Sequence, residues 1–327
     1  MILAGDIGGT KTLLALFEIV NDDIVLKTKE KFESRSFNSF EEIFSKFAGS
    51  NNNIEAAVFG VPGPVLNGEV QLTNLSWNLS ENKISNEFNI GKVKLINDLG
   101  ATAYSIPYLN EDELIQINKG SNRYAVERYT VLAPGTGLGE AFLICESNEK
   151  MILPSEGGHS DFAPSNDLEI ELLKYLLKRY NRVSYERIIS GSGLPNIFDF
   201  LVEYGYGIPK EETLERFKEE DKSQVISEMG LSGKDKLCCD ALEIFVSVLG
   251  AHAGNLVLTN LTTGGVYLGG GIPHKIKSLL LGEIFLTSFK NKGRLSSLLE
   301  ATPVYIINNN EAALKGASLY AKSLIGK

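Results

Sequence analysis

The sequence is poor in residues that form covalent cross-links or bind metals. Among 327 residues it has 3 His and 3 Cys, and the cysteines are Cys145, Cys238 and Cys239. Three cysteines cannot form a disulfide framework for a chain of this length, and none lies in a Cys-x-x-Cys zinc spacing. We therefore expect a protein of a reducing compartment, and we assign no residue as a metal ligand.

Positive charge is also scarce. The 32 Lys and Arg residues against 41 Asp and Glu leave a formal net charge of −9. No basic stripe is available to neutralise a phosphate backbone, so we expect no nucleic-acid partner. The N-terminus has no basic segment, and Asp6 interrupts its apolar run, which argues against a secretory signal and for a cytoplasmic protein.

Long hydrophobic runs are nearly absent. Residues 244–274 contain no Asp, Glu, Lys or Arg and are numerous enough to cross a bilayer. Polar His252 and Asn255 and five glycines after position 263 interrupt this run. We therefore expect a buried helix followed by a buried strand, and no membrane partner.

Glycine is the abundant residue, with 32 copies in a chain that is 43% hydrophobic. The composition is typical of a soluble globular protein, and the length predicts about two domains. The glycines cluster at the ends of apolar segments that have the length of strands. Their positions, more than their number, carry the prediction of function.

Two blocks of the chain share one predicted pattern. Each opens with a strand, a glycine corner and a second strand, and then continues into alternating strands and helices. This repetition predicts a duplicated α/β architecture. We expect the first three strands near 1–7, 12–19 and 24–32, a second meander of strands near 114–117, 129–133, 139–145 and 151–154, and a closing strand and helix near 304–307 and 310–324.

The first two glycine corners resemble known nucleotide loops without matching them. Gly5-Asp6-Ile7-Gly8-Gly9-Thr10-Lys11 lacks the glycine that a P-loop has before its lysine, and a strand follows it. Gly135-Thr136-Gly137-Leu138-Gly139 fails the dinucleotide-binding spacing. One such corner would be read as an ordinary hairpin turn. Two corners, each after a buried strand, predict a clamp whose backbone amides and threonine hydroxyl bind phosphate.

Six motifs together carry a resemblance to a known family. They run in order along the chain and are Gly5-Asp6-Ile7-Gly8-Gly9-Thr10, Leu95-Ile96-Asn97-Asp98, Ala133-Pro134-Gly135-Thr136-Gly137-Leu138-Gly139, Glu156-Gly157-Gly158-His159, Glu186-Arg187-Ile188-Ile189-Ser190-Gly191 and Leu268-Gly269-Gly270-Gly271-Ile272. In type, order and spacing the set resembles the bacterial-type glucokinase family. The resemblance implies the two-domain actin-like ATPase (ribonuclease H-like) α/β fold with a cleft between domains. We expect a small domain of 1–108 plus 303–327 and a large domain of 109–302.

The same resemblance implies the reaction and its residues. The expected activity is ATP-dependent phosphorylation of the 6-hydroxyl of glucose, with ATP and Mg²⁺ as cofactors and a homodimer as the assembly. The implied glucose contacts are Asn97, Asp98, Glu156, His159 and Glu186, with Asn74 in support. The implied nucleotide contacts are Gly5, Asp6, Ile7, Gly8, Gly9, Thr10, Gly135, Thr136, Gly137, Gly269, Gly270 and Gly271.

The carboxylates suit the steps of phosphoryl transfer, which needs positioning, charge stabilisation and a base. Asp98 follows a predicted buried strand and is our candidate for the base, although capping the next helix is the structural alternative. Asp6 lies beside the first corner, where it can bind waters around Mg²⁺. Glu156 and His159 share a loop with two glycines that we expect to let it approach a ligand closely.

Two alternatives stay open on the residues alone. One is a sugar kinase of different hexose preference, including the broader repressor and sugar-kinase group, which carries a cysteine cluster after its similar loop. Here Ser160-Asp161-Phe162-Ala163-Pro164 follows, without cysteine. The other is a sugar-sensing protein on the same fold that transfers no phosphate and needs no base at position 98. Polyphosphate is the alternative to ATP as donor.

Overall fold

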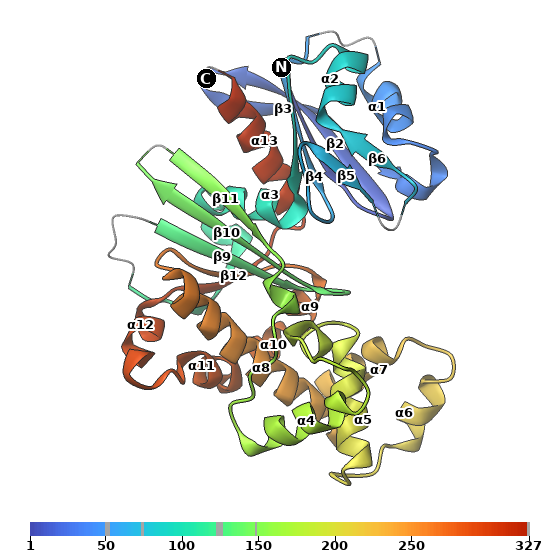
Figure 1. The fold of residues 1–327 in the computed structure, drawn as a ribbon, viewed down its shortest axis with the longest axis vertical. Coiled ribbons are helices and arrows are strands. Elements are labelled where there is room, and N and C mark those ends of the chain that lie inside the picture. Colours follow the sequence, from blue (N-terminus) through green and yellow to red (C-terminus); the bar gives the residue numbers. More distant parts are fainter. Residues whose placement is uncertain (50–52, 73–74, 122–126, 148, 326–327) are drawn as a thin grey trace.

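The structure is a computed structural model, and it describes the chain apart from residues 50–52, 73–74, 122–126, 148 and 326–327. Asn74 therefore lies outside the described residues. The chain forms two lobes, and both termini lie in the upper one in Figure 1. We call residues 1–108 with 312–325 the small lobe and residues 109–307 the large lobe.

The small lobe is built on one sheet of five strands, which are β1 (Ile2–Ile7), β2 (Lys11–Val20), β3 (Asp23–Glu33), β4 (Ala56–Val61) and β7 (Lys92–Asn97). Their order is β3-β2-β1-β4-β7. The first three are antiparallel, whereas β4 is parallel to both β1 and β7. Every residue of β4 is buried, as expected for a central parallel strand. The edge strand β3 is exposed and rich in Lys and Glu, which protects it from pairing with another chain.

The large lobe repeats this order in a six-stranded sheet. Its strands are β8 (Leu114–Asn118), β9 (Glu127–Pro134), β10 (Leu138–Glu146), β11 (Glu149–Ser155), β12 (Gly265–Leu268) and β13 (Val304–Ile307). The order is β11-β10-β9-β12-β13-β8. The first five strands in this order match the five of the small lobe, so the predicted duplication is confirmed. A separate hairpin of β5 (Glu69–Gln71) and β6 (Asn78–Ser80) extends from the small lobe.

Two strands lie elsewhere than the sequence predicted. The strand at 114–117 was expected to open the second meander, but β8 pairs with β13 at the opposite edge of the sheet. The expected domain boundary at 302/303 placed the strand 304–307 in the small domain, and this placement is wrong. Because β13 pairs with both β12 and β8, the chain returns to the small lobe only after Ile307.

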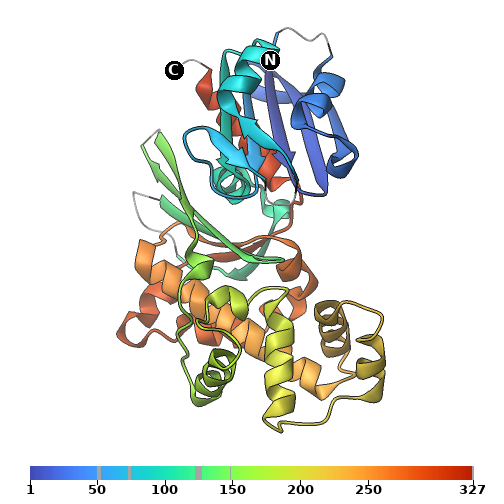
Figure 2. The same cartoon turned by 45° about the vertical axis from the view of Figure 1, so that its right-hand side comes forward.

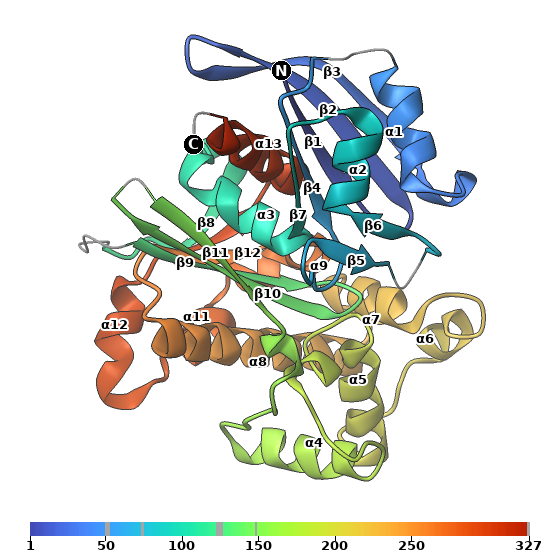
Figure 3. The same ribbon diagram turned by 45° about the horizontal axis from the view of Figure 1, so that its top comes forward.

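The helices cover the two sheets. They are α1 (Phe40–Ala48), α2 (Glu81–Phe88), α3 (Asp98–Ser105), α4 (Asp167–Leu177), α5 (Gly193–Glu203), α6 (Glu211–Arg216), α7 (Lys222–Leu231), α8 (Lys236–Asn260), α9 (Gly271–Lys275), α10 (Lys277–Leu280), α11 (Glu283–Lys290), α12 (Ser296–Ala301) and α13 (Ala312–Leu324). In Figure 3, α1 and α2 lie on one face of the small sheet, and α13 lies on the other.

Helices α3 and α13 lie between the two sheets (Figure 3). The two helices pack closely, because Gly316 of α13 lies where an added Cβ would be only 1.7 Å from the carbonyl oxygen of Ala101. Tyr104 of α3 packs in one cluster with Tyr129 and Tyr267 of the large sheet. Helix α3 is thereby fixed between the lobes.

Helix α8 is the core of the large lobe and runs beneath its sheet (Figures 1 and 2). It is the one helix among the described residues that is long and apolar enough to cross a membrane. Phe245, Val246 and Leu249 have at most 1% of their surface exposed, so α8 is a core helix of the folded chain. This confirms the buried helix followed by a buried strand that residues 244–274 predicted.

Candidate active site

The first glycine corner joins β1 to β2 and is held by a side chain from a distant segment. The amide of Gly8 donates to the carbonyl of Lys11 at 2.8 Å. The buried hydroxyl of Ser34 donates to the Gly8 carbonyl at 2.7 Å, and the amide of Ser34 donates to the Thr10 carbonyl at 3.0 Å. Sequence reasoning missed Ser34, since no local pattern connects it to the corner.

Asn97 and Asp98 stand at the junction of β7 and α3. Asn97 is the N-cap, and its Oδ1 accepts the amides of Leu99 and Gly100 at 3.0 and 3.3 Å. Asp98 is therefore free of the capping role that was the structural alternative for it. The Asp98 Oδ1 accepts the amide of Leu99 at 2.8 Å, and the hydrogen bonds of the described residues leave Oδ2 open.

Asp6 lies near Asp98, on the same side of the small sheet. Because side chains alternate along a strand, Asp6 shares the face of Ile2 and Ala4, which pack in one cluster with α13. Burial and the charge of Asp98 raise the pKa of Asp6 to about 6. Burial also raises the pKa of Asp98, against the opposing effect of its backbone hydrogen bonds. Two half-buried carboxyl groups at this position would attract a solvated cation.

Among the residues that the structure describes, no group of three or more His, Cys, Asp or Glu side chains could hold a metal ion. This does not conflict with Mg²⁺ at Asp6, because Mg²⁺ keeps several waters and is commonly bound through one or two carboxylates plus phosphate oxygens. Burial and the charge of Asp98 raise the pKa of Asp6, and a cation bound beside it would favour its ionised form. The donor set therefore fits a hydrated Mg²⁺ that arrives with a nucleotide.

The second glycine corner joins β9 to β10 and contacts the segment around Glu186. The amide of Gly135 donates to the carbonyl of Gly137 at 2.8 Å, and the amide of Gly191 donates to the Gly135 carbonyl at 2.7 Å. The Glu186 Oε2 accepts the amide of Leu138 at 2.9 Å. A Cβ added to Gly137 would lie 2.5 Å from that same oxygen. The predicted phosphate corner and a predicted sugar residue are therefore in direct contact.

The sugar loop, which we define as residues 156–160, lies next to this corner. The ring nitrogen Nδ1 of His159 is 3.8 Å from Oε1 of Glu186. Glu156 and His159 are exposed, whereas Glu186 is half-buried. The structure thus brings His159 and Glu186 together from two segments, with Glu156 at the start of the same loop.

The two glycines of the sugar loop have a packing role in addition to the close approach to a ligand that we predicted. A Cβ on Gly158 would lie 2.0 Å from the carbonyl oxygen of Leu138, and one on Gly157 would lie 2.1 Å from Oε2 of Glu140. The glycines are needed because the loop packs directly on strand β10.

The third glycine cluster connects β12 to α9. Gly270 has a φ of 84°, a conformation that favours glycine, and its added Cβ would lie 3.1 Å from the Pro134 carbonyl oxygen. The cluster therefore packs against the end of β9, directly before the second glycine corner. Gly271 begins α9.

A cavity of about 540 Å³ lies beside these two glycine clusters. Gly135, Thr136 and Gly271 line it, and its apolar wall includes Leu242 and Phe245. The other lining residues are Ser190, Gly191, Ser192, Leu194, Pro195, Asp221, Ser223, Gln224, Ser227, Ile272, Lys275 and Ile276. The cavity has the size and the mixed lining of a small-ligand pocket.

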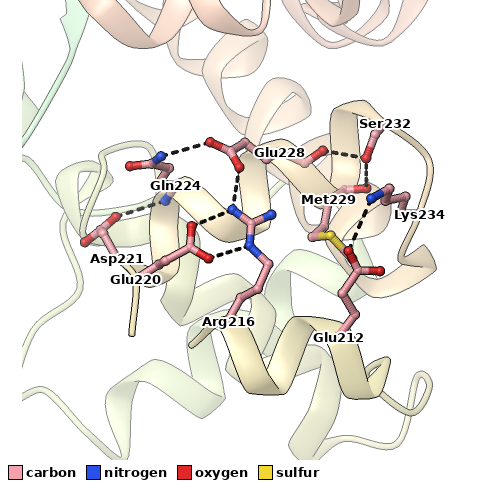
Figure 4. A network of polar contacts seen from close by, with 9 residues as sticks. All are labelled: Glu212, Arg216, Glu220, Asp221, Gln224, Glu228, Met229, Ser232 and Lys234. Carbon is pink, nitrogen blue, oxygen red and sulfur yellow. Dashed lines mark hydrogen bonds and ion pairs between the residues drawn. The ribbon is translucent and has the colours of Figure 1, made fainter. Parts of the chain in front are cut away.

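Helix α7 forms one wall of this cavity and was not predicted from the sequence. An ion-pair network ties it to α6, as Figure 4 shows. Two guanidinium nitrogens of Arg216, Nε and Nη2, donate to Glu220 at 2.6 Å, and Nη2 also pairs with Glu228 at 2.5 Å. Nε2 of Gln224 donates to Glu228 at 2.9 Å. The network fixes Gln224 and its neighbours at the cavity.

Comparisons with known proteins identify the family. A family model described as Glucokinase matches residues 3–324. This chain belongs to the glucokinase family. The glucokinase of Nostoc sp. is 38% identical over 341 residues, with 99% of each chain covered. The resemblance that the six motifs indicated is thereby confirmed.

Solved glucokinase structures support the fold. The crystal structure of a glucokinase from an Antarctic psychrotroph is 30% identical, covers 98% of each chain and gives a TM-score of 0.87. A ROK family glucokinase from Streptomyces griseus, in complex with glucose and AMPPNP, is 19% identical. The match covers 98% of this chain and 99% of that one and gives a TM-score of 0.58. Both carry the two-domain actin-like ATPase fold that the sequence predicted.

Proposed function

We propose that this glucokinase family member transfers the terminal phosphoryl group of ATP to the 6-hydroxyl of glucose, giving glucose 6-phosphate and ADP, the first step of glycolysis. The observation that carries the proposal is the division of roles at the start of α3. Asn97 caps the helix, and the half-buried carboxyl group of Asp98 keeps one oxygen open at the junction of the lobes.

Asp98 is the proposed general base. Its ionised carboxylate accepts the proton of the 6-hydroxyl as the oxygen attacks the phosphorus atom, and the bond between that phosphorus and the bridging oxygen of ADP breaks. Burial raises the pKa of Asp98, which makes the ionised group a stronger proton acceptor. The amide of Leu99 holds Oδ1, so Oδ2 is the oxygen that faces the sugar.

Glu156, His159 and Glu186 bind the other hydroxyls of the sugar. A sugar hydroxyl both donates and accepts hydrogen bonds, and a set of two carboxylates and an imidazole offers partners for both. Asn97 contributes less than the motif implied, because its Oδ1 is used by the helix cap and its Nδ2 donates to the Gly63 carbonyl at 3.3 Å. One amide hydrogen of Nδ2 is left for glucose.

The nucleotide binds between the two glycine corners, with its base in the cavity beside α7. The first corner (Gly5, Asp6, Ile7, Gly8, Gly9 and Thr10) and the second (Gly135, Thr136 and Gly137) bind the phosphates through backbone amides and threonine hydroxyls. Gly269, Gly270 and Gly271 lie under the nucleoside. Mg²⁺ held through water at Asp6 would neutralise the phosphate charge.

The cavity favours ATP over polyphosphate as the donor. Its wall includes Leu242, Phe245 and Ile272, whose apolar surface suits a base and offers nothing to a chain of phosphates. The ROK family glucokinase from Streptomyces griseus was solved with AMPPNP, an ATP analogue. We further propose a cytoplasmic homodimer, on the basis of the family, which light scattering of the purified protein tests.

A coupled assay tests the proposed reaction. Purified protein is mixed with glucose, Mg²⁺ and ATP, and glucose 6-phosphate is detected with a dehydrogenase that accepts only the 6-phosphate. Mannose, fructose and glucosamine replace glucose in parallel wells that measure ADP release, and ADP and polyphosphate replace ATP in wells that measure glucose 6-phosphate. We expect glucose with ATP to give the highest kcat/KM. If no hexose releases ADP, the chain is a sugar-binding protein without kinase activity, and the proposal is wrong.

A further inference from the structure

A buried pair of ionisable side chains lies beneath the sugar loop. Glu140 of β10 and His252 of α8 are each 2% exposed, and Nε2 of His252 is hydrogen-bonded to Oε1 of Glu140 at 2.5 Å. Their remaining polar atoms, Glu140 Oε2 and His252 Nδ1, are buried without a hydrogen-bond partner among the described residues. The proposed reaction uses neither side chain.

The carboxylate touches the sugar loop directly. Because side chains alternate along β10, Glu140 faces α8 together with Leu138, whereas Gly139 faces α3. A Cβ added to Gly157 would lie 2.1 Å from Glu140 Oε2, so the backbone of Gly157 rests on this oxygen. The carboxylate therefore limits where the segment between Glu156 and His159 can lie.

The imidazole contacts the second segment of the proposed sugar site. The ring of His252 packs on the ring of Tyr185, with centroids 3.8 Å apart and an angle of 30°. Asn255, one turn along α8, donates from Nδ2 to the Tyr185 hydroxyl at 2.9 Å. Tyr185 directly precedes Glu186 in the chain. The pair thus supports both segments that supply the proposed sugar contacts.

A buried ionisable pair such as Glu140 and His252 adds little to the stability of the fold. Removing two ionisable groups from water has a large desolvation penalty, and well-packed apolar residues of similar volume commonly give equal or greater stability. A buried polar contact does, however, fix one geometry, because its hydrogen bond has a defined length and direction. Because the pair lies under the sugar loop, its fixed geometry also fixes the position of that loop.

We propose that the Glu140–His252 pair is a positioning unit that sets the affinity for glucose. It does so by fixing the position of the sugar loop relative to the segment that carries Glu186. This inference rests on the proposed function. Neither side chain touches the sugar, so both are positioning residues. The orientation of the loop depends on the contact between Nε2 and Oε1, and not only on the space that the two side chains fill.

Three variants test the pair. His252→Phe keeps a ring on Tyr185 and removes the donor to Glu140, and we expect KM for glucose to rise at least about tenfold, since small misplacements at a binding site have effects of this size. Glu140→Gln keeps the side-chain volume and removes the charge, and we expect a smaller rise. His252→Gln restores a donor and should return KM for glucose toward the wild-type value. KM for ATP should change less than about twofold in all three.

Thr130→Val is the matched control. Thr130 and Thr262 form another buried polar pair in the large lobe, with hydroxyls 2.7 Å apart, and Thr130 lies in no proposed sugar contact. We expect this variant to lower the melting temperature and to leave KM for glucose unchanged.

The results separate this inference from the proposed function. A wild-type protein that phosphorylates no glucose overturns the proposed function. If the wild type is active and His252→Phe and Glu140→Gln only lower the melting temperature, with KM for glucose within twofold, the pair is purely structural and the inference is wrong. The inference is also wrong if kcat falls and the KM values for glucose and ATP rise by the same factor.

Discussion

Asp6 lies on β1, and Asp98 begins α3 directly after β7, which is not a neighbour of β1 in the small sheet. The charge of Asp98 nevertheless acts on Asp6 and helps to raise its pKa to about 6. Strand β4 lies between β1 and β7 and carries Gly60 opposite Asp6. A Cβ on Gly60 would lie 3.5 Å from the Cα of Asp98, so a larger side chain here would fill the space between the two acids. The two proposed roles, metal-water binding and base, are therefore electrostatically coupled.

The first prediction concerns the pH dependence of nucleotide binding. Asp6 must be ionised to bind the waters of Mg²⁺, and it gains a proton as the pH falls through about 6. We therefore expect the Kd for Mg-ATP to rise below pH 6, by up to about tenfold per pH unit. Calorimetry between pH 5 and pH 8 measures it. The terminal phosphate of ATP also titrates near pH 6. Asp6→Asn is the control for this effect, because the variant lacks the carboxyl group and keeps only the pH dependence that comes from ATP.

The second prediction concerns the stability of the Asp6→Asn variant. The folded pKa of about 6 lies above the ordinary Asp value of 3.8, so the folded state binds the proton more tightly. The stabilising contribution of protonated Asp6 is complete below pH 3.8 and is lost as the pH rises through 6. At pH 8 the ionised group lowers stability by about 3 kcal/mol, at about 1.4 kcal/mol per pKa unit.

Asp6→Asn should therefore unfold at a higher temperature than the wild type at pH 8, and the difference should shrink at pH 5. Thermal melting at both pH values measures it. An unchanged difference between the two pH values would contradict the assigned pKa.

The limits of the sequence prediction are visible in particular residues. The corners at Gly8 and Gly135 were predictable, because glycine clusters after buried strands form a local pattern. The role of Ser34 was not, because Ser34 holds the first corner from beyond the whole of the second and third strands. Strand 304–307 was assigned to the small domain because it precedes a helix that does belong there, whereas its pairing is a long-range property.

The third prediction separates Asp98 from Asn97. Asp98→Asn should lower kcat by about 10²–10⁴-fold, because the base is lost, with no loss of melting temperature. Asn97→Ala removes two cap hydrogen bonds and should lower the stability by about 1 kcal/mol, with a smaller effect on kcat. Steady-state kinetics and thermal melting measure both. A near-normal kcat in Asp98→Asn would contradict the assignment of the base.

The fourth prediction uses two glycines of the second corner. In Gly137→Ala the new Cβ would lie 2.5 Å from Oε2 of Glu186 and must displace it, so KM for glucose should rise at least about tenfold. In Gly135→Ala no atom of the described residues lies within 4 Å of the new Cβ, and only a bound nucleotide would meet it. KM for ATP alone should rise in that variant. Equal changes in both substrates would contradict this division.

The last prediction concerns the wall of the nucleotide cavity. Arg216 is the centre of the network that joins α6 to α7 and fixes Gln224 through Glu228 (Figure 4). Arg216→Ala removes the shared partner of Glu220 and Glu228 and leaves their like charges unbalanced. We expect KM for ATP to rise about threefold to tenfold, as a loss of roughly 1 kcal/mol would produce, with KM for glucose unchanged. Lys218→Ala is the control, because among the described residues Lys218 forms its ion pair with Glu215 alone, at 2.6 Å on the exposed side of the same segment. Initial rates with each substrate varied in turn measure both variants. If Lys218→Ala weakens ATP binding as much as Arg216→Ala does, general charge explains the effect and the network does not position the wall.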